Sequence, residues 1–190
     1  MFGLFDNLFT KEKSGHLKYK RGHLKGKRGY ISGPIENAPD PLWFQEPVHI
    51  LENKFKIDLL NPFEDEKQQW VPDLLAAREN KDYEKMKSIA KDFVHKDLTW
   101  VNHSDFIISH IPYKVATTGT HHEIIEGNAN KKPVLLVCPE GKELVPFWYY
   151  GFIPHKHMFG SWKALYAYLE EVDAGEHKDD YKWSFVYGLI

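Results

Sequence analysis

The stretch that decides the fold is FIISHIPYKVATTGTHHEIIE, residues 106–126. Its first three residues are apolar and partly β-branched, which is typical of a buried strand. The polar run of residues 117–120 interrupts this pattern, and its threonines offer a hydroxyl to cap a following helix. We expect that helix to open at His121. Glu123 would then lie in its first turn, at the end of the sheet where open α/β proteins bind ligands.

The carboxylate of Glu123 has two interpretations. A carboxylate in the first turn of a helix often complements the positive helix N-terminus, which would be a structural role. Alternatively, Glu123 is a catalytic nucleophile directed into a cleft. The spacing alone leaves both interpretations open.

The rest of the chain alternates between expected strands and helices. Such alternation is typical of a parallel sheet with right-handed crossovers. We therefore expect an α/β protein with a Rossmann-like or flavodoxin-like parallel sheet flanked by helices. The expected strands are residues 29–31, 56–60, 106–108 and 133–138, and a turn that extends to residue 36 follows the first of them. The expected helices are residues 41–55, 70–77, 83–103, 121–126 and 162–172.

Two C-terminal regions are less regular. Residues 144–152 are aromatic and fit either a strand or a loop, and residues 183–190 fit either a last strand or a docked tail. Ser161 is expected to cap the helix that follows it. In the long helix of residues 83–103, we expect the buried face to consist of Met86, Ile89, Phe93, Leu98 and Val101.

Length and composition exclude several classes of protein. The chain has 190 residues, 42% hydrophobic and 15% aromatic, which predicts one folded domain rather than disorder. The net charge of -2 makes a nucleic-acid partner unlikely, and the single cysteine, Cys138, excludes an intramolecular disulfide. No apolar run reaches the ~20 residues of a membrane span, and no signal peptide is evident. We expect a cytoplasmic protein.

The first 28 residues differ from the rest. An apolar face within residues 1–9 precedes a basic run over residues 11–28. One interpretation is a membrane-surface anchor or a nucleic-acid arm. Another is an apolar segment docked on the domain or on a partner subunit, followed by a solvated linker, and a third places some of these cations near a bound phosphate. We therefore divide the chain into an arm, 1–28, and a domain, 29–190.

No metal site and no cofactor are expected. His121 and His122 are neighbours on a helix, so their side chains point apart. The pair His155 and His157 has no third ligand at zinc spacing.

Three segments over residues 29–138 carry a combination of motifs. The first is YISGPI, residues 30–35, and the second is DLTW, residues 97–100, followed by SDFII. The third is GTHHE, residues 119–123, followed by KPV at 132–134. In this order and spacing, they resemble the nucleoside 2-deoxyribosyltransferase family, including its branch of 2′-deoxynucleoside 5′-monophosphate N-hydrolases.

The resemblance implies cleavage of the N-glycosidic bond between a (deoxy)ribose and a base. In that family, the glutamate matching Glu123 attacks the anomeric carbon, and water or a second base resolves the glycosyl-enzyme. Asp97 matches the second acidic residue, which would protonate the leaving base. Tyr30 matches a tyrosine that hydrogen-bonds and orients the nucleophile. A carboxylate suits this role because it stabilises an oxocarbenium-like transition state and can bond covalently.

The resemblance also implies a nucleoside or nucleotide as substrate, no cofactor, and a homo-oligomer with sites near subunit interfaces. Gly33 would allow close approach of the backbone to the ligand. The expected substrate-binding residues are Ser32, Gly33, Pro34, Ile35, Thr117, Thr118 and Gly119.

Each assignment has a structural alternative. Asp97 would cap or salt-bridge within its helix, and Tyr30 would be an ordinary strand residue. Asp105 is expected to anchor the start of its strand through backbone hydrogen bonds.

The chain departs from the family at three positions. Thr117 stands where transferases acting on free nucleosides commonly have an aspartate, which favours hydrolysis or phosphate contact. Pro34 and Glu36 stand where the monophosphate hydrolases have a serine and an arginine that hold phosphate. These departures place the sequence between the two branches.

Two other functions compete with the enzyme. One is a catalytically silent nucleotide sensor on the same fold, and the other is an anchoring or nucleic-acid-associated protein that acts through its first 28 residues. Fold alone does not decide between them.

Overall fold

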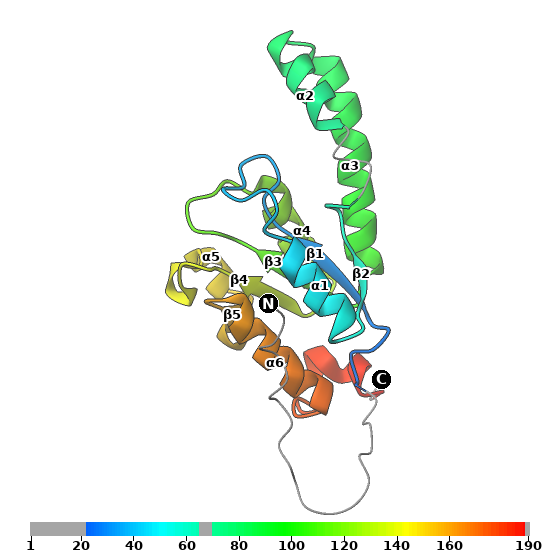
Figure 1. Cartoon of the computed structure of the whole chain (residues 1–190), viewed down its shortest axis with the longest axis vertical. Coiled ribbons are helices and arrows are strands. Elements are labelled where there is room, and N and C mark those ends of the chain that lie inside the picture. The colour runs from blue at the N-terminus through cyan, green and yellow to red at the C-terminus, as the bar shows by residue number, and fades with distance from the viewer. Residues whose placement is uncertain (1–21, 65–69, 189–190) are drawn as a thin grey trace, which may run out of the picture.

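The computed structural model describes residues 22–64 and 70–188 (Figure 1). The predictions for the apolar face of residues 1–9 and for most of the basic run lie outside the described residues. The described part of the chain forms an α/β domain from which one helical hairpin projects.

The centre of the domain is an all-parallel sheet of five strands in the order β2-β1-β3-β4-β5. This is the flavodoxin-like order, so the predicted fold class is confirmed. The fifth strand was not predicted, because two residues are too few to produce a periodic pattern. The strands are β1 (Arg28–Ser32), β2 (Asp58–Leu60), β3 (Phe106–His110), β4 (Val134–Val137) and β5 (Met158–Phe159).

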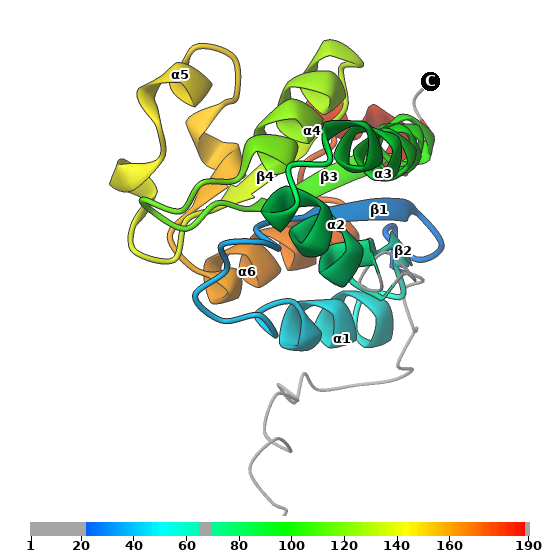
Figure 2. The ribbon, with the colours of Figure 1, turned by 90° about the horizontal axis from the view of Figure 1, so that it is seen from above.

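Helices cover both faces of the sheet. Figure 2 shows α1 (Gln45–Asn53) and α6 (Trp162–Ala174) on one face, and α3 (Tyr83–His103) and α4 (Thr118–Ala129) on the other. The central strands are therefore buried on both sides, which explains the continuous apolar runs at residues 106–108 of β3 and 134–137 of β4. Along β1, Ile31 packs in the core under α1 and α6, whereas Tyr30 packs in the core under α3 and α4.

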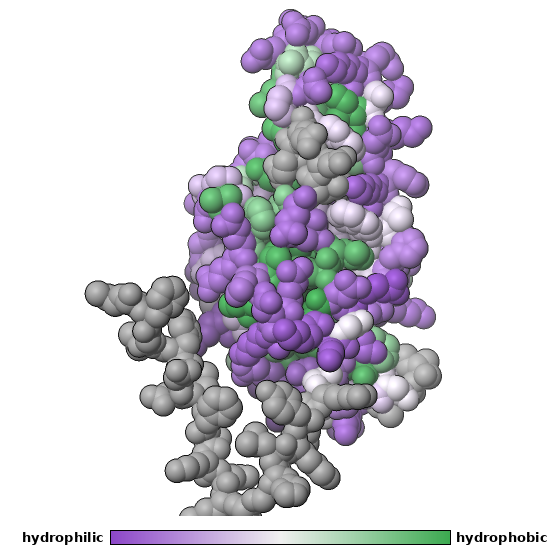
Figure 3. All heavy atoms as spheres, turned by 45° about the vertical axis from the view of Figure 1, so that its right-hand side comes forward, coloured by the Kyte–Doolittle hydropathy of each residue, from purple (hydrophilic) through white to green (hydrophobic). Residues whose placement is uncertain are grey.

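The helix α2 (Trp70–Glu79) packs against α3, and the two project above the sheet (Figure 1). The face of this projection seen in Figure 3 is mostly hydrophilic, with hydrophobic side chains between the polar ones. Of the five residues predicted to form the buried face of α3, only Val101 is buried, and the other four are half-buried. The prediction was wrong for these four because the projecting part of α3 has α2 as its neighbour rather than the sheet.

Two helices begin elsewhere than predicted. α1 begins at Gln45 rather than at residue 41, because Asp40 Oδ1 accepts a hydrogen bond from the Leu42 backbone N–H (2.9 Å) and holds a turn there. α4 begins at Thr118, three residues before His121. Glu123 therefore lies in the second turn of α4, not the first, and it is less suited to complement the helix N-terminus than we expected.

The segment between β4 and β5 is neither the strand nor the loop predicted for residues 144–152. It contains two short helical turns, η2 (Lys142–Leu144) and α5 (Phe147–Tyr150), followed by η3 (His155–His157). Pro146 and Pro154 precede two of these turns and fix the backbone angle there. The aromatic residues suggested a strand, but the prolines prevent one.

Other local predictions are confirmed. Ser161 Oγ accepts a hydrogen bond from the Ala164 backbone N–H (3.1 Å) and caps α6. Asp105 Oδ2 accepts one from the Arg28 backbone N–H (2.7 Å) and anchors the start of β3 beside β1. Residues 181–188 form a docked segment rather than a strand, with η4 (Tyr181–Val186) placing Trp183 in the core.

Candidate functional site

The order of the sheet reverses between β1 and β3. The chain leaves the carboxyl end of β1 toward α1 on one face, and the carboxyl end of β3 toward α4 on the other. Ligands of open α/β folds bind in the crevice at such a switch point. Ser32 and Ser109 are register partners at these two strand ends, and their buried hydroxyls share a hydrogen bond of 2.8 Å.

A tyrosine of β1 and a glutamate of α4 meet beneath this switch point. α4 buries Thr120, Glu123, Ile124 and Gly127, a stripe at helical spacing, so Glu123 faces the sheet. Tyr30 is fully buried, and Glu123 is only 8% exposed. The Tyr30 hydroxyl donates a hydrogen bond of 2.7 Å to Oε1 of Glu123. A buried carboxylate requires such a partner, because its lost hydration is costly otherwise.

Electrostatics keep Tyr30 in its protonated form. Burial raises the pKa of Tyr30 well above its ordinary value, and the negative charges of Glu123 and Asp97 raise it further. The phenol therefore remains a hydrogen-bond donor at every physiological pH. Asp97 is half-buried on α3 and close enough to act on Tyr30, so the structure places the three residues predicted to be catalytic in one region.

The turn after β1 places the next four predicted residues. Ser32 and Pro34 are buried, Gly33 is half-buried and Ile35 is exposed. A Cβ atom on Gly33 would overlap the Trp43 indole and lie 3.1 Å from Cβ of His110. The space beside Gly33, where we expected a ligand, is occupied here by Trp43.

Sequence reasoning missed two aromatic residues beside this turn. Trp43 donates a hydrogen bond from Nε1 to the carbonyl oxygen of Pro34 (3.0 Å), and its ring stacks on His110 with centroids 4.3 Å apart. Burial lowers the pKa of His110 to about 4, so this ring is neutral near pH 7. Its Nδ1 atom is buried, and no described residue hydrogen-bonds it. No motif in the sequence pointed to either residue.

The predicted residues at the start of α4 do not share one environment. Thr117 is buried, whereas Thr118 and Gly119 are exposed on the first turn. Thr117 occupies the N-cap position, but its side chain makes no capping hydrogen bond. Instead, its hydroxyl lies 3.3 Å from Nε2 of His121. The predicted hydroxyl cap is therefore absent at Thr117.

A pocket of about 370 Å³ lies beside the start of α4. Residues 111–115 of the loop after β3 and residues 143–147 form its walls, together with Thr117 and His121. The side chain of His121 also contacts the Tyr149 hydroxyl through Nδ1. Tyr30 and Glu123 are not among the residues that line this pocket, so it is separate from the buried pair.

Among residues 22–64 and 70–188, no three His, Cys, Asp or Glu side chains are grouped so as to hold a metal ion. Within the same ranges, no helix combines the length and the apolar character that crossing a bilayer requires. The chain matches no known protein-family model and no curated protein.

Proposed function

We propose that this protein cleaves the N-glycosidic bond of a (deoxy)nucleoside or of its 5′-monophosphate, with Glu123 as the nucleophile. The observation that carries the proposal is the buried hydrogen bond of 2.7 Å from Tyr30 to Glu123 at the switch point of the sheet. This bond engages Oε1 of the carboxylate and holds its orientation. The carboxylate of Glu123 is the group that would attack.

The reaction would proceed in two steps. In the first, a carboxylate oxygen of Glu123 forms a bond to the anomeric carbon while the bond from that carbon to the base nitrogen breaks. The electron pair leaves with the base, and Asp97 supplies the proton that neutralises it. In the second step, water attacks the anomeric carbon, the ester bond to Glu123 breaks, and a proton returns to Asp97.

The second step decides between hydrolysis and transfer. A free base in place of water would give transfer of the deoxyribosyl group. Thr117 stands where the transferases that this chain resembles have an aspartate, which favours hydrolysis. Glu36 forms an ion pair with Arg78 (2.6 Å). The turn after β1 therefore carries an acidic side chain where the monophosphate hydrolases have an arginine that holds phosphate.

The test is turnover of a panel of deoxynucleosides and their 5′-monophosphates by the full chain, with and without a second free base. Chromatography would follow the released and exchanged bases, and mass spectrometry would detect a glycosyl adduct on Glu123. Glu123→Gln should abolish both signals. Glu84→Gln is the matched control, because this glutamate is exposed on α3. Folded protein that turns over no member of the panel would overturn the proposal.

The burial of Glu123 favours a second candidate, a nucleotide-binding protein without turnover. With Glu123 only 8% exposed and Trp43 beside Gly33, a sugar has little room to reach the carboxylate in this conformation. Saturable binding of a nucleotide that never yields free base would support this candidate.

We also propose that the protein acts in the cytoplasm as a homo-oligomer. Exposed apolar side chains on the projecting hairpin, Leu75 on α2 and Val94 on α3, support self-association. Sedimentation equilibrium tests this, and a monomer at all concentrations would contradict it.

A further inference from the structure

One side chain from the connection between β1 and α1 covers the switch point of the sheet. From Ile35 to Leu42, every residue of this connection except Ala38 is exposed. Trp43, which follows, turns inward. Its indole lies so close to Gly33 that a Cβ atom there would overlap it, and it stacks on His110. The indole therefore fills space at the carboxyl ends of β1 and β3, where open α/β proteins bind their ligands.

The polar contacts that hold this connection are local or exposed. The indole Nε1–H donates to the carbonyl oxygen of Pro34 (3.0 Å), which belongs to the same connection. The backbone N–H of Trp43 donates to the carbonyl oxygen of Asp40 (3.4 Å), again within the connection. Glu36 reaches Arg78 on α2, but both side chains are more than half exposed, so water screens this ion pair. The indole can therefore leave without breaking a hydrogen bond of the sheet.

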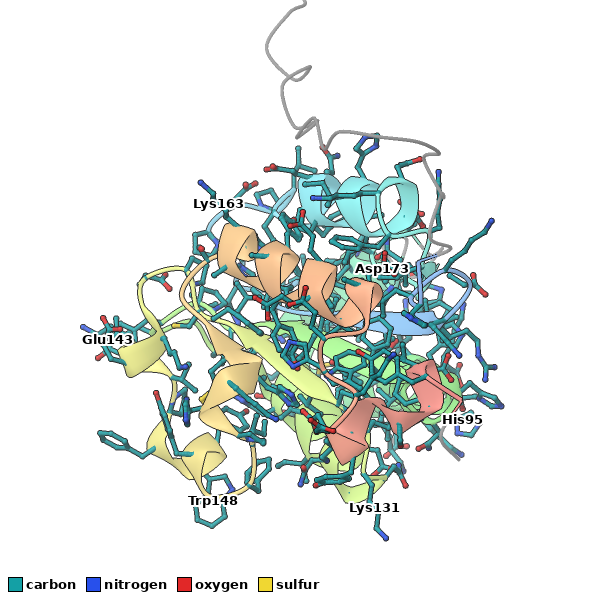
Figure 4. All side chains as sticks on the ribbon, turned by 90° about the horizontal axis from the view of Figure 1, so that it is seen from below. His95, Lys131, Glu143, Trp148, Lys163 and Asp173 are labelled. Carbon is teal, nitrogen blue, oxygen red and sulfur yellow. The ribbon has the colours of Figure 1, made fainter. Side chains whose placement is uncertain are left out.

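Aromatic packing holds the indole of Trp43 in its present position. Its ring contacts Phe63 edge-on, with centroids 4.9 Å apart, and lies nearly parallel to Trp162 at 6.0 Å. Figure 4 shows α1 and α6 side by side on this face, with Lys163, the residue after Trp162, pointing outward. Trp43 and Trp162 are both half-buried. The rings therefore stabilise the covered arrangement from the margin of the core rather than from its interior.

A buried polar atom beneath the indole lacks a partner. His110 is only 7% exposed, and no residue in the described part of the chain hydrogen-bonds its buried Nδ1 atom. The nearby hydroxyls of Ser32 and Ser109 bond to each other. A buried nitrogen without a hydrogen bond is costly, and a ligand or water that reached it would remove this cost. A half-buried cover thus lies over a group that gains a hydrogen bond when the cover leaves.

We propose that Trp43 is a movable lid on the switch point, closed in this structure, whose indole swings away from Gly33 and His110 to admit a ligand. In the open state, Nδ1 of His110 is a hydrogen-bonding group of the uncovered crevice. A ligand that needs the open state binds with an apparent affinity reduced by the fraction of open molecules, so the lid regulates binding. That the lid controls access to Glu123 rests on the proposed function, whereas its opening does not.

Hydrogen exchange of the indole N–H groups in the full chain, followed by NMR, tests the opening without any substrate. Trp43→Phe assigns the Trp43 signal. Trp183 is the matched control, since it is fully buried and its Nε1–H donates to the Tyr168 hydroxyl (2.7 Å). The Trp43 N–H should exchange at least about tenfold faster and with little dependence on urea, because local opening exposes little surface. Equal rates with equal urea dependence would make Trp43 part of the cooperative core and overturn the proposal.

Modification of His110 by diethyl pyrocarbonate, read by peptide mass spectrometry, tests what the lid covers. Trp43→Ala removes the lid and Gly33→Ala displaces it, so each should speed modification at least about fivefold. His157 is the matched control, since it is 1% exposed and burial lowers its pKa to about 4, as it does for His110. Gly119→Ala, whose methyl group meets nothing within 4 Å, should change neither histidine. Faster modification of both histidines, or of neither, in the two lid variants would overturn the proposal.

A last measurement links the lid to the proposed reaction. The best substrate of the turnover panel should speed exchange of the Trp43 N–H, because a ligand that binds only the open state shifts the population toward it. Slower exchange with substrate bound would show that the substrate enters beneath a closed lid and would overturn the regulatory role. The two failures are distinguishable. A lid that opens by exchange and uncovers His110, in protein that turns over no substrate, would reject the glycosidase and leave the lid established.

Discussion

Tyr30 and Glu123 lie 93 residues apart in the sequence and share a buried hydrogen bond of 2.7 Å. One residue belongs to the first strand of the sheet and the other to the buried stripe of α4. The bond therefore ties a central strand to the helix that covers it. It also fixes the orientation of a carboxylate whose residue is only 8% exposed.

Tyr30→Phe should lower both stability and turnover. It removes the donor and leaves the carboxylate of Glu123 without this hydrogen bond, which costs about 1–3 kcal/mol of unfolding free energy. If Tyr30 positions the nucleophile, kcat should fall while KM changes little. Urea unfolding and steady-state kinetics measure the two effects. Tyr181→Phe, at an exposed position, should change neither. Unchanged kcat in a destabilised Tyr30→Phe protein would reduce Tyr30 to a structural role.

Glu123→Ala should lower turnover of the best substrate by a thousandfold or more. A loss of this size corresponds to about 4 kcal/mol of activation free energy, as expected when a covalent nucleophile is removed. Rapid quenching followed by intact-mass analysis should find a glycosyl adduct on the wild-type chain and none on the variant. A variant that keeps a tenth or more of wild-type activity would contradict a nucleophilic role.

Acid should destabilise the fold through two buried histidines. Burial lowers the pKa of His110 and of His157 from 6.5 to about 4, and for His157 the carboxylate of Asp180 opposes this shift. Between pH 6.5 and pH 4, the unfolded chain therefore binds more protons than the folded chain. The stability that the neutral histidines confer is complete above pH 6.5 and is lost as the pH falls toward 4. Between pH 6.5 and about pH 5, each histidine should lower the free energy of unfolding by about 2 kcal/mol.

Denaturant unfolding at several pH values measures this slope. His157→Gln and His110→Gln should each make it shallower, whatever they do to stability at neutral pH. His49→Gln, at an exposed position on α1, should leave the slope unchanged. Parallel stability curves for all four proteins would show that neither buried histidine controls the acid response.

Gly33→Ala and Gly119→Ala should have opposite effects on stability. The methyl group on Gly33 would overlap the indole of Trp43 and displace it, which costs about 1–3 kcal/mol, as other overpacked sites do. The methyl group on Gly119 would meet nothing within 4 Å, and alanine is the better helix residue by about 0.5–1 kcal/mol. Thermal unfolding compares the two. A stable Gly33→Ala protein with unshifted tryptophan fluorescence would contradict the close packing of Trp43.

Local patterns predicted the central strands well, because β3 and β4 contain runs of apolar residues, and in β1 the pair Tyr30 and Ile31 precedes a Gly/Pro turn. They predicted the edges of the domain less well. β5 is too short to leave a pattern, and the turns around α5 depend on prolines within an aromatic segment. The buried face of α3 was also misjudged, because helical spacing indicates which side is apolar but not whether the sheet extends that far.

The sequence by itself determined that this chain builds a parallel α/β sheet, since the apolar runs of β3 and β4 suit strands that helices cover on both faces. It also determined the order of the motifs in which Glu123 lies. Only the tertiary structure decided which residues meet. The order of the strands and the face on which each helix packs bring Trp43 to Gly33 and His121 to Tyr149. They also form the hydrogen bond between Tyr30 and Glu123, which the family resemblance had implied but no local pattern could show. Contacts between distant segments depend on how whole elements pack, and the periodicity of one segment carries no information about its neighbour in space.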